Sequence, residues 1–176
     1  MARVTLPERD SLPEALQSRW DRTASRGSVL NIQRLFLVNT EIELNAFRVW
    51  RASGLSDRAR EIVILRAAFT QESRYEWHQH VRIARGAGLT DAEINAVTAW
   101  RDATCFSPAE RALLAYVDAM AAGPRPSDDV FAAVATGRSD AEMVGVTFLV
   151  GLYFSLAKLM AAFDLETEEP FVGWRV

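Results

Sequence analysis

The sequence predicts an all-α protein with about eight or nine helices in a single domain over residues 1–176. Apolar residues recur at helical spacing between the nine glycines and six prolines. The capping pattern of Ser or Thr followed three residues later by Glu occurs at 90–93, 107–110 and 139–142. No Asn-Gly or Asp-Gly pair stands between alternating Val, Ile and Thr, so β-hairpins are not predicted.

The first half of the chain predicts five helices. Pro13 fits the first turn of the first helix, and Gly54 ends the third. Ser56 caps the fourth helix, on which Ile62, Leu65, Ala68 and Phe69 form the expected inward stripe. Gly88 is a left-handed stop for the fifth helix. The expected ranges are 12–23, 30–38, 41–51, 58–71 and 74–87.

The second half predicts four more helices, at about 90–101, 108–122, 128–136 and 140–163. Ser127 caps the third of these, and Gly137 ends it. Residues 143–157 are uncharged but shorter than the roughly 18 residues that span a bilayer. The sequence therefore predicts a helix buried in the protein or in a subunit interface, followed by an acidic and then aromatic tail at 166–176.

Composition narrows the class of protein. Apolar residues make up 49% of the chain, charged residues 24%, and the net charge is −3. That is an ordinary globular mixture, and the absence of a basic stripe argues against nucleic-acid binding. Cys105 is the single cysteine, which excludes an intramolecular disulfide and is expected to be a small, partly buried residue. The charged N-terminus does not resemble a secretory signal, so a cytoplasmic location is expected.

Both histidines fall in one segment, 73–80. Ser73, Glu76 and His80 share one helix face, and Glu76 lies one turn before His80. We expect Glu76 to hydrogen-bond His80 and fix its tautomer for proton transfer, whereas His78 points away toward solvent. Glu61 borders the apolar stripe of the preceding helix, where its carboxylate needs a partner or a wet cleft. An ordinary surface Glu-His pair remains the alternative.

The blocks REIVILR at 60–66 and YEWHQHVRIARGAGLTDAEI at 75–94 resemble the carboxymuconolactone decarboxylase family, which includes the alkylhydroperoxidase D-like proteins. The resemblance is strongest over 56–98, leaving 1–52 as an N-terminal helical extension. In the peroxidase branch the pattern is Glu, Cys, Cys and His; here Glu61, Ser73, Glu76 and His80 occupy those positions at the same spacing. Both sulfurs are missing, so an alkylhydroperoxidase-like antioxidant activity is disfavoured.

The resemblance instead implies a cofactor-independent lyase related to 4-carboxymuconolactone decarboxylase. It would decarboxylate, protonate or isomerise a small unsaturated lactone or aromatic-derived acid, without a metal or organic cofactor. His80 would be the general acid, with Glu76 orienting it and Glu61 as a second acid/base or positioning group. Candidate substrate-binding residues are Ser73, Tyr75, Trp77 and Arg66.

The resemblance also implies a homo-oligomer, as a dimer, trimer or hexamer, with no nucleic-acid or membrane partner. Three alternatives stay open at this level. One is a metal site formed by Glu61, Glu76 and His80. Another is a non-catalytic oligomeric binding scaffold that uses residues 143–163 as its interface. The third is a redox sensor that uses Cys105 between subunits.

Overall fold

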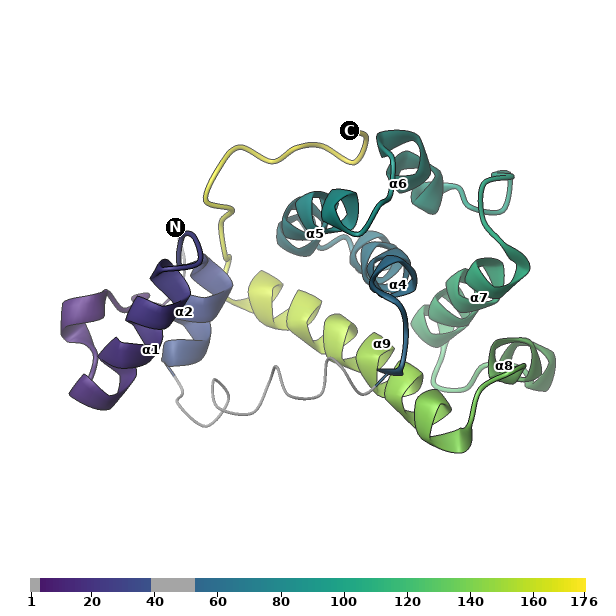
Figure 1. Ribbon diagram of the computed structural model, residues 1–176, viewed down its shortest axis with the longest axis horizontal. Helices are drawn as coiled ribbons and strands as arrows, with labels where there is room; N and C mark the ends of the chain where they lie inside the picture. Colours follow the sequence, from purple (N-terminus) through teal and green to yellow (C-terminus); the bar gives the residue numbers. More distant parts are fainter. Residues whose placement is uncertain (1–3, 39–52) are drawn as a thin grey trace.

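The computed structural model describes residues 4–38 and 53–176, and all regular structure in these ranges is helical (Figure 1). The predicted all-α class is therefore confirmed. The expected helix at 41–51 lies outside the described residues. The elements are the short 3-10 helix η1 (Arg9–Ser11), α1 (Glu14–Ala24), α2 (Asn31–Leu37), α4 (Asp57–Thr70), α5 (Arg74–Gly86), α6 (Asp91–Thr98), α7 (Pro108–Ala122), α8 (Asp128–Ala135) and α9 (Asp140–Ala162).

Predicted helix caps account for most helix starts after residue 55. Side-chain oxygens accept hydrogen bonds from backbone N–H groups three residues on, because those first-turn donors have no partner inside the helix. The five residues that do this are Ser56, Thr90, Ser107, Ser127 and Ser139. At the other end of α5, Gly88 has φ +88°, as the predicted left-handed stop requires. Helix α6 ends at Thr98, three residues before the predicted end.

Helix α4 is buried on every side, so the predicted four-residue inward stripe is too narrow. Val63, Ile64 and Ala67 are as inaccessible as Ile62 and Leu65, at 0% exposure. The reason is the position of α4, which contacts α5, α6, α7 and α9 (Figure 1). One flank of α4 packs with α5 and α6, and the other packs with α7 and α9. Amphipathic periodicity is lost when a helix occupies the centre of a domain.

Helix α9 is the predicted long apolar helix. Its length and composition would allow it to cross a membrane, and 44% of its most apolar 18-residue window is buried inside the protein. Val146, Leu149 and Val150 belong to the core beside α4 and α7. On its outer face Val144 and Phe148 are exposed, next to Phe131 of α8. Part of this helix is therefore core, and part is unpaired apolar surface.

The C-terminal tail runs back from the end of α9 across α5 to α6 (Figure 1). The indole N–H of Trp77 donates to the carbonyl oxygen of Gly173 at 2.9 Å. Asn95 exchanges two hydrogen bonds with the Val176 backbone, at 2.7 and 2.8 Å. His78 is half-buried and its Nδ1 accepts from the Val172 N–H at 3.2 Å. The prediction of a solvent-facing His78 is therefore wrong, because the tail covers that side of α5.

Candidate active site

A tight connection between α4 and α5 brings the predicted site residues together. Residues 71–73 join the two helices, and Glu72 adopts φ +52°, in the left-handed region that short turns use. Helix α5 folds back against α4, which brings Glu61 beside His80 although they are 19 residues apart. Ser73 is the residue before α5; it is buried but its side chain makes no cap hydrogen bond.

The imidazole of His80 is held by Glu61. Its Nδ1 lies 2.6 Å from Oε2 of Glu61, whose side chain is completely buried. The guanidinium Nε of Arg60 lies 3.5 Å from the other carboxylate oxygen. A buried carboxylate at Nδ1 keeps the proton on that nitrogen, so Nε2 is the atom left to exchange protons with a ligand. The Tyr153 ring packs edge-on against the imidazole, with centroids 5.2 Å apart.

The prediction that Glu76 orients His80 is wrong. Glu76 is 3% exposed, and neither of its carboxylate oxygens has a hydrogen-bond partner among the described residues. The partner that sequence spacing assigned to Glu76 comes from the neighbouring helix instead. Burial raises the pKa of the Glu76 carboxyl well above its ordinary value, because the ionised form is poorly solvated there. Glu76 is therefore a neutral carboxylic acid with a free O–H donor.

Glu76 and His80 line the same cavity, of about 210 Å³. An apolar cavity of about 150 Å³ holds benzene, so this volume suits one small substituted ring. Its walls come from α5, α9 and the start of α2. The lining residues are Leu30, Ile32, Gln33, Tyr75, Glu76, Gln79, His80, Ile83, Tyr153, Leu156 and Met160. Apart from Glu76 and His80, the lining is apolar or carries neutral polar groups.

Of the four predicted substrate-binding residues, Tyr75 alone lines this cavity. Arg66 is held elsewhere: its Nε donates to Asp118 at 2.5 Å and its guanidinium also donates to the carbonyl oxygens of Val97 and Thr98. Trp77 is fully buried in the core between α4 and the tail. Ser73 does not line the cavity. These residues support the fold around the site.

Other predicted features are settled by position. Cys105 is exposed and does not line the cavity, so the expectation of a partly buried residue is wrong. In the described ranges, no three His, Cys, Asp or Glu side chains gather closely enough to hold a metal ion.

Several cavity residues were missed by sequence reasoning. Gln79 adjoins His80 in the sequence and lies three residues after Glu76, so helical spacing could have found it. Ile32, Tyr153 and Met160 come from distant helices and carry no local signal. Their contribution depends on how α2 and α9 pack against α5.

Comparison with known proteins places this geometry in context. The sequence profile of the carboxymuconolactone decarboxylase family matches residues 40–119, which include Glu61, Glu76 and His80. Among curated proteins, no sequence matches the chain. A solved structure from Agrobacterium tumefaciens, described as a putative antioxidant defence protein AhpD of unknown function, is 26% identical. That match covers 74% of this chain and 90% of the other, with a TM-score of 0.68.

Two further structures share the fold over almost the whole chain. An uncharacterised peroxidase-related protein from Silicibacter sp. TM1040 gives a TM-score of 0.85 at 16% identity, covering 99% of this chain and 96% of the other. The debrominase Bmp8, solved with 2,3,4-tribromopyrrole, gives 0.78 at 15% identity, covering 96% and 94%. Residues 40–119 therefore belong to the carboxymuconolactone decarboxylase family, on an AhpD-like helical fold that lacks the two cysteines of the peroxidase branch.

Proposed function

We propose that this protein is a cofactor-independent enzyme that decarboxylates a small unsaturated lactone acid and protonates the resulting carbanion. The observation that carries the proposal is a single small cavity lined by two different proton-transfer groups. His80 is oriented from behind by Glu61, and Glu76 is buried without a partner. Titratable groups with contrasting environments are typical of acid/base sites.

Each group has a distinct role in this reaction. The C–C bond to the carboxylate breaks, CO2 leaves, and the electron pair passes through the conjugated system to the lactone carbonyl oxygen. The neutral acid of Glu76 donates a hydrogen bond to that oxygen as negative charge develops on it. Protonated His80 then delivers its Nε2 proton to carbon, while Glu61 holds Nδ1 throughout. Solvent reprotonates His80 for the next turnover.

The apolar lining contributes to the same step. A carboxylate bound among Ile83, Leu156 and Met160 loses hydration that the more diffuse charge of the transition state needs less. The family match supports this chemistry. The tribromopyrrole-bound relative has the same fold and binds a small unsaturated ring. Thiol-dependent peroxide reduction is not proposed, because Ser73 and Glu76 stand at the two cysteine positions.

Turnover of 4-carboxymuconolactone tests the proposal, followed by ultraviolet absorbance and CO2 release. We expect His80→Ala to lower turnover by about 10² to 10⁴, and Glu76→Leu by about 10² to 10³. His78→Ala is the matched control, because this second histidine does not line the cavity. Full activity in His80→Ala would refute the assignment. A wild-type protein that binds related lactones without converting them would instead be a binding scaffold.

We also propose that the protein acts as a cytoplasmic homo-oligomer. Three large apolar side chains, Phe131, Val144 and Phe148, are exposed over neighbouring parts of α8 and α9. Clustered exposed apolar residues of this kind are typical of protein interfaces. Sedimentation velocity should therefore show a species larger than 19.6 kDa, and Phe148→Glu should reduce it toward the monomer. A monomeric wild-type protein would contradict this part of the proposal.

A further inference from the structure

Two hollows lie on either side of one thin wall between α2 and α5. The inner one is the cavity that contains Glu76 and His80. The outer one is a groove of about 590 Å³, which opens beside the C-terminal tail. Leu30, Gln33 and Gln79 line both hollows. A ligand that moves from the groove to His80 therefore passes the start of α2.

One carboxylate of the tail holds this wall together. Oε1 of Glu168 accepts from the Tyr75 hydroxyl at 2.7 Å and from the Asn31 backbone N–H at 2.5 Å. Its Oε2 accepts from the Gln79 amide at 2.5 Å. Two of these donors belong to α5 and the third to the first turn of α2. Hydrogen bonds to an ionised acceptor are stronger than neutral ones, so Glu168 is the strongest link across the seam.

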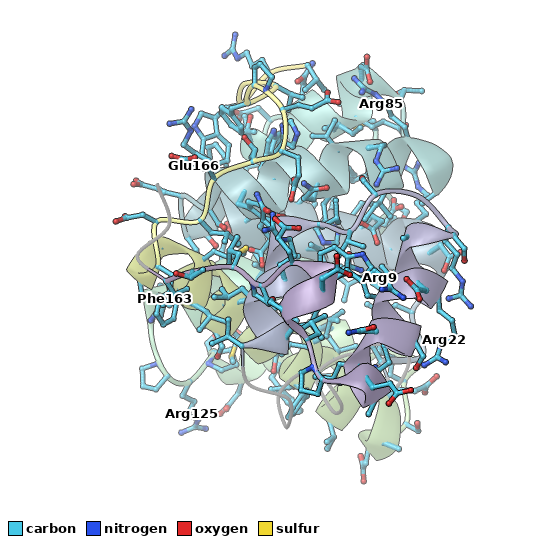
Figure 2. The ribbon with its side chains drawn as sticks, turned by 90° about the vertical axis from the view of Figure 1, so that its left-hand side faces the viewer. Arg9, Arg22, Arg85, Arg125, Phe163 and Glu166 are labelled. Carbon is cyan, nitrogen blue, oxygen red and sulfur yellow. The ribbon has the colours of Figure 1, made fainter. Side chains whose placement is uncertain are left out.

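Tyr75 extends the same link. Its hydroxyl oxygen accepts from the Ile32 N–H at 3.1 Å while its proton goes to Glu168. Burial and the Glu168 carboxylate both raise the pKa of the phenol far above its ordinary value, so Tyr75 stays a donor. Two unpaired N–H groups of the first turn of α2 are thus satisfied through one tail residue. Figure 2 views this side, with α1 and α2 in front and the tail passing Glu166 after Phe163.

We propose that Glu168 is the latch of a gate through which substrate enters the Glu76–His80 cavity from the outer groove. Opening separates the first turn of α2 from Tyr75 and Gln79, and reclosing restores the three hydrogen bonds to Glu168. Glu168 is therefore a positioning residue that controls access. The proposal rests on the proposed function only in taking this cavity as the reactive site.

The matched pair Glu168→Gln and Glu169→Gln tests the latch. Glu169 lies beside it in the tail and lines the same groove, and its carboxylate makes no hydrogen bond among the described residues. In Glu168→Gln the amide nitrogen faces a donor, so at least one of the three bonds is lost. Tyr75→Phe removes the bridge to Ile32 and keeps the ring.

Two readouts report opening without needing a substrate. The first is hydrogen exchange of the Asn31 and Ile32 amides, which we expect to quicken about tenfold or more in Glu168→Gln and Tyr75→Phe. The second is acylation of His80 by diethyl pyrocarbonate, followed by mass spectrometry, which should accelerate similarly. Amides in α4 should keep wild-type exchange, and Glu169→Gln should match wild type in both readouts.

Wild-type rates at Asn31, Ile32 and His80 in Glu168→Gln would overturn the latch. Equal acceleration in Glu169→Gln would also overturn it, since the effect would then be one of tail charge. Accelerated access in a protein without lactone turnover would refute the proposed function and leave the latch standing. Turnover that depends on His80 but is unaffected by Glu168→Gln, with unchanged access, would do the reverse.

Discussion

The Glu76 side chain links stability and chemistry in opposite directions. Burial without a partner raises the pKa of its carboxyl in the folded state, while the unfolded chain titrates near the ordinary value of 4.5. Below that value both states are protonated and no penalty arises. As pH rises above it, the unfolded chain loses its proton first, so the free energy of unfolding falls until pH reaches the folded-state pKa.

Glu76→Gln removes this titration with little change in shape. We expect the melting temperature of the variant, relative to wild type, to increase as pH is raised from 4 to 8. Buried amide effects are independent of pH and cancel in the trend, as do all other titrating groups. Thermal unfolding of both proteins across this range checks it. A difference that stays constant with pH would show that Glu76 is not held neutral in the folded state.

At this scale the sequence predicted the members of the site better than their contacts. Glu61, Glu76 and His80 all reach one region, as their spacing and the family resemblance indicated. The partner of His80 was mistaken because helical spacing gives shared faces, and contact between α4 and α5 is a tertiary fact. Arg66 shows the same limit: its guanidinium is taken by Asp118, 52 residues away.

At the scale of the element, α4 is the helix on which the site depends. It carries Glu61 and is packed on all sides, so we expect Val63→Ala to lower the free energy of unfolding by about 2 kcal/mol through lost burial and a small cavity. The matched control is Val144→Ala on α9, where the side chain is 70% exposed. Its effect should be within about 0.5 kcal/mol.

Urea denaturation at two protein concentrations measures both variants and separates folding from any association. Equal losses in the two variants would contradict the central position of α4. Helix starts such as Ser107 and Ser139 were predictable, because a cap is a local hydrogen-bond pattern. The full burial of α4 was not, since it depends on which helices surround it.

For the whole molecule, the fold class followed from helical periodicity and capping, while the tail's role was invisible in the sequence. Residues 166–176 read as a polar and aromatic end, yet they cover α5 and satisfy Trp77 and Asn95. Contacts between segments about 90 residues apart leave no local pattern. The cavity wall therefore could not be predicted beyond α5.

The molecule as a whole should be inert as a thiol peroxidase. Cys105, the single cysteine, is exposed and lies outside the cavity. We expect consumption of cumene hydroperoxide, with dithiothreitol as reductant, to be the same for wild type and Cys105→Ser and no faster than the protein-free reaction. Catalytic consumption that disappears in Cys105→Ser would return the chain to the antioxidant class.

The coupling between Glu61 and His80 is the most direct test of the proposed chemistry. Turnover of 4-carboxymuconolactone is measured for Glu61→Gln, His80→Ala and the double variant, with circular dichroism to confirm folding. Because Glu61 acts through the imidazole, each single change should lower turnover by at least about 10², and the double variant should be no slower than His80→Ala. Full activity in Glu61→Gln, or losses that multiply in the double variant, would contradict a catalytic Glu61–His80 pair.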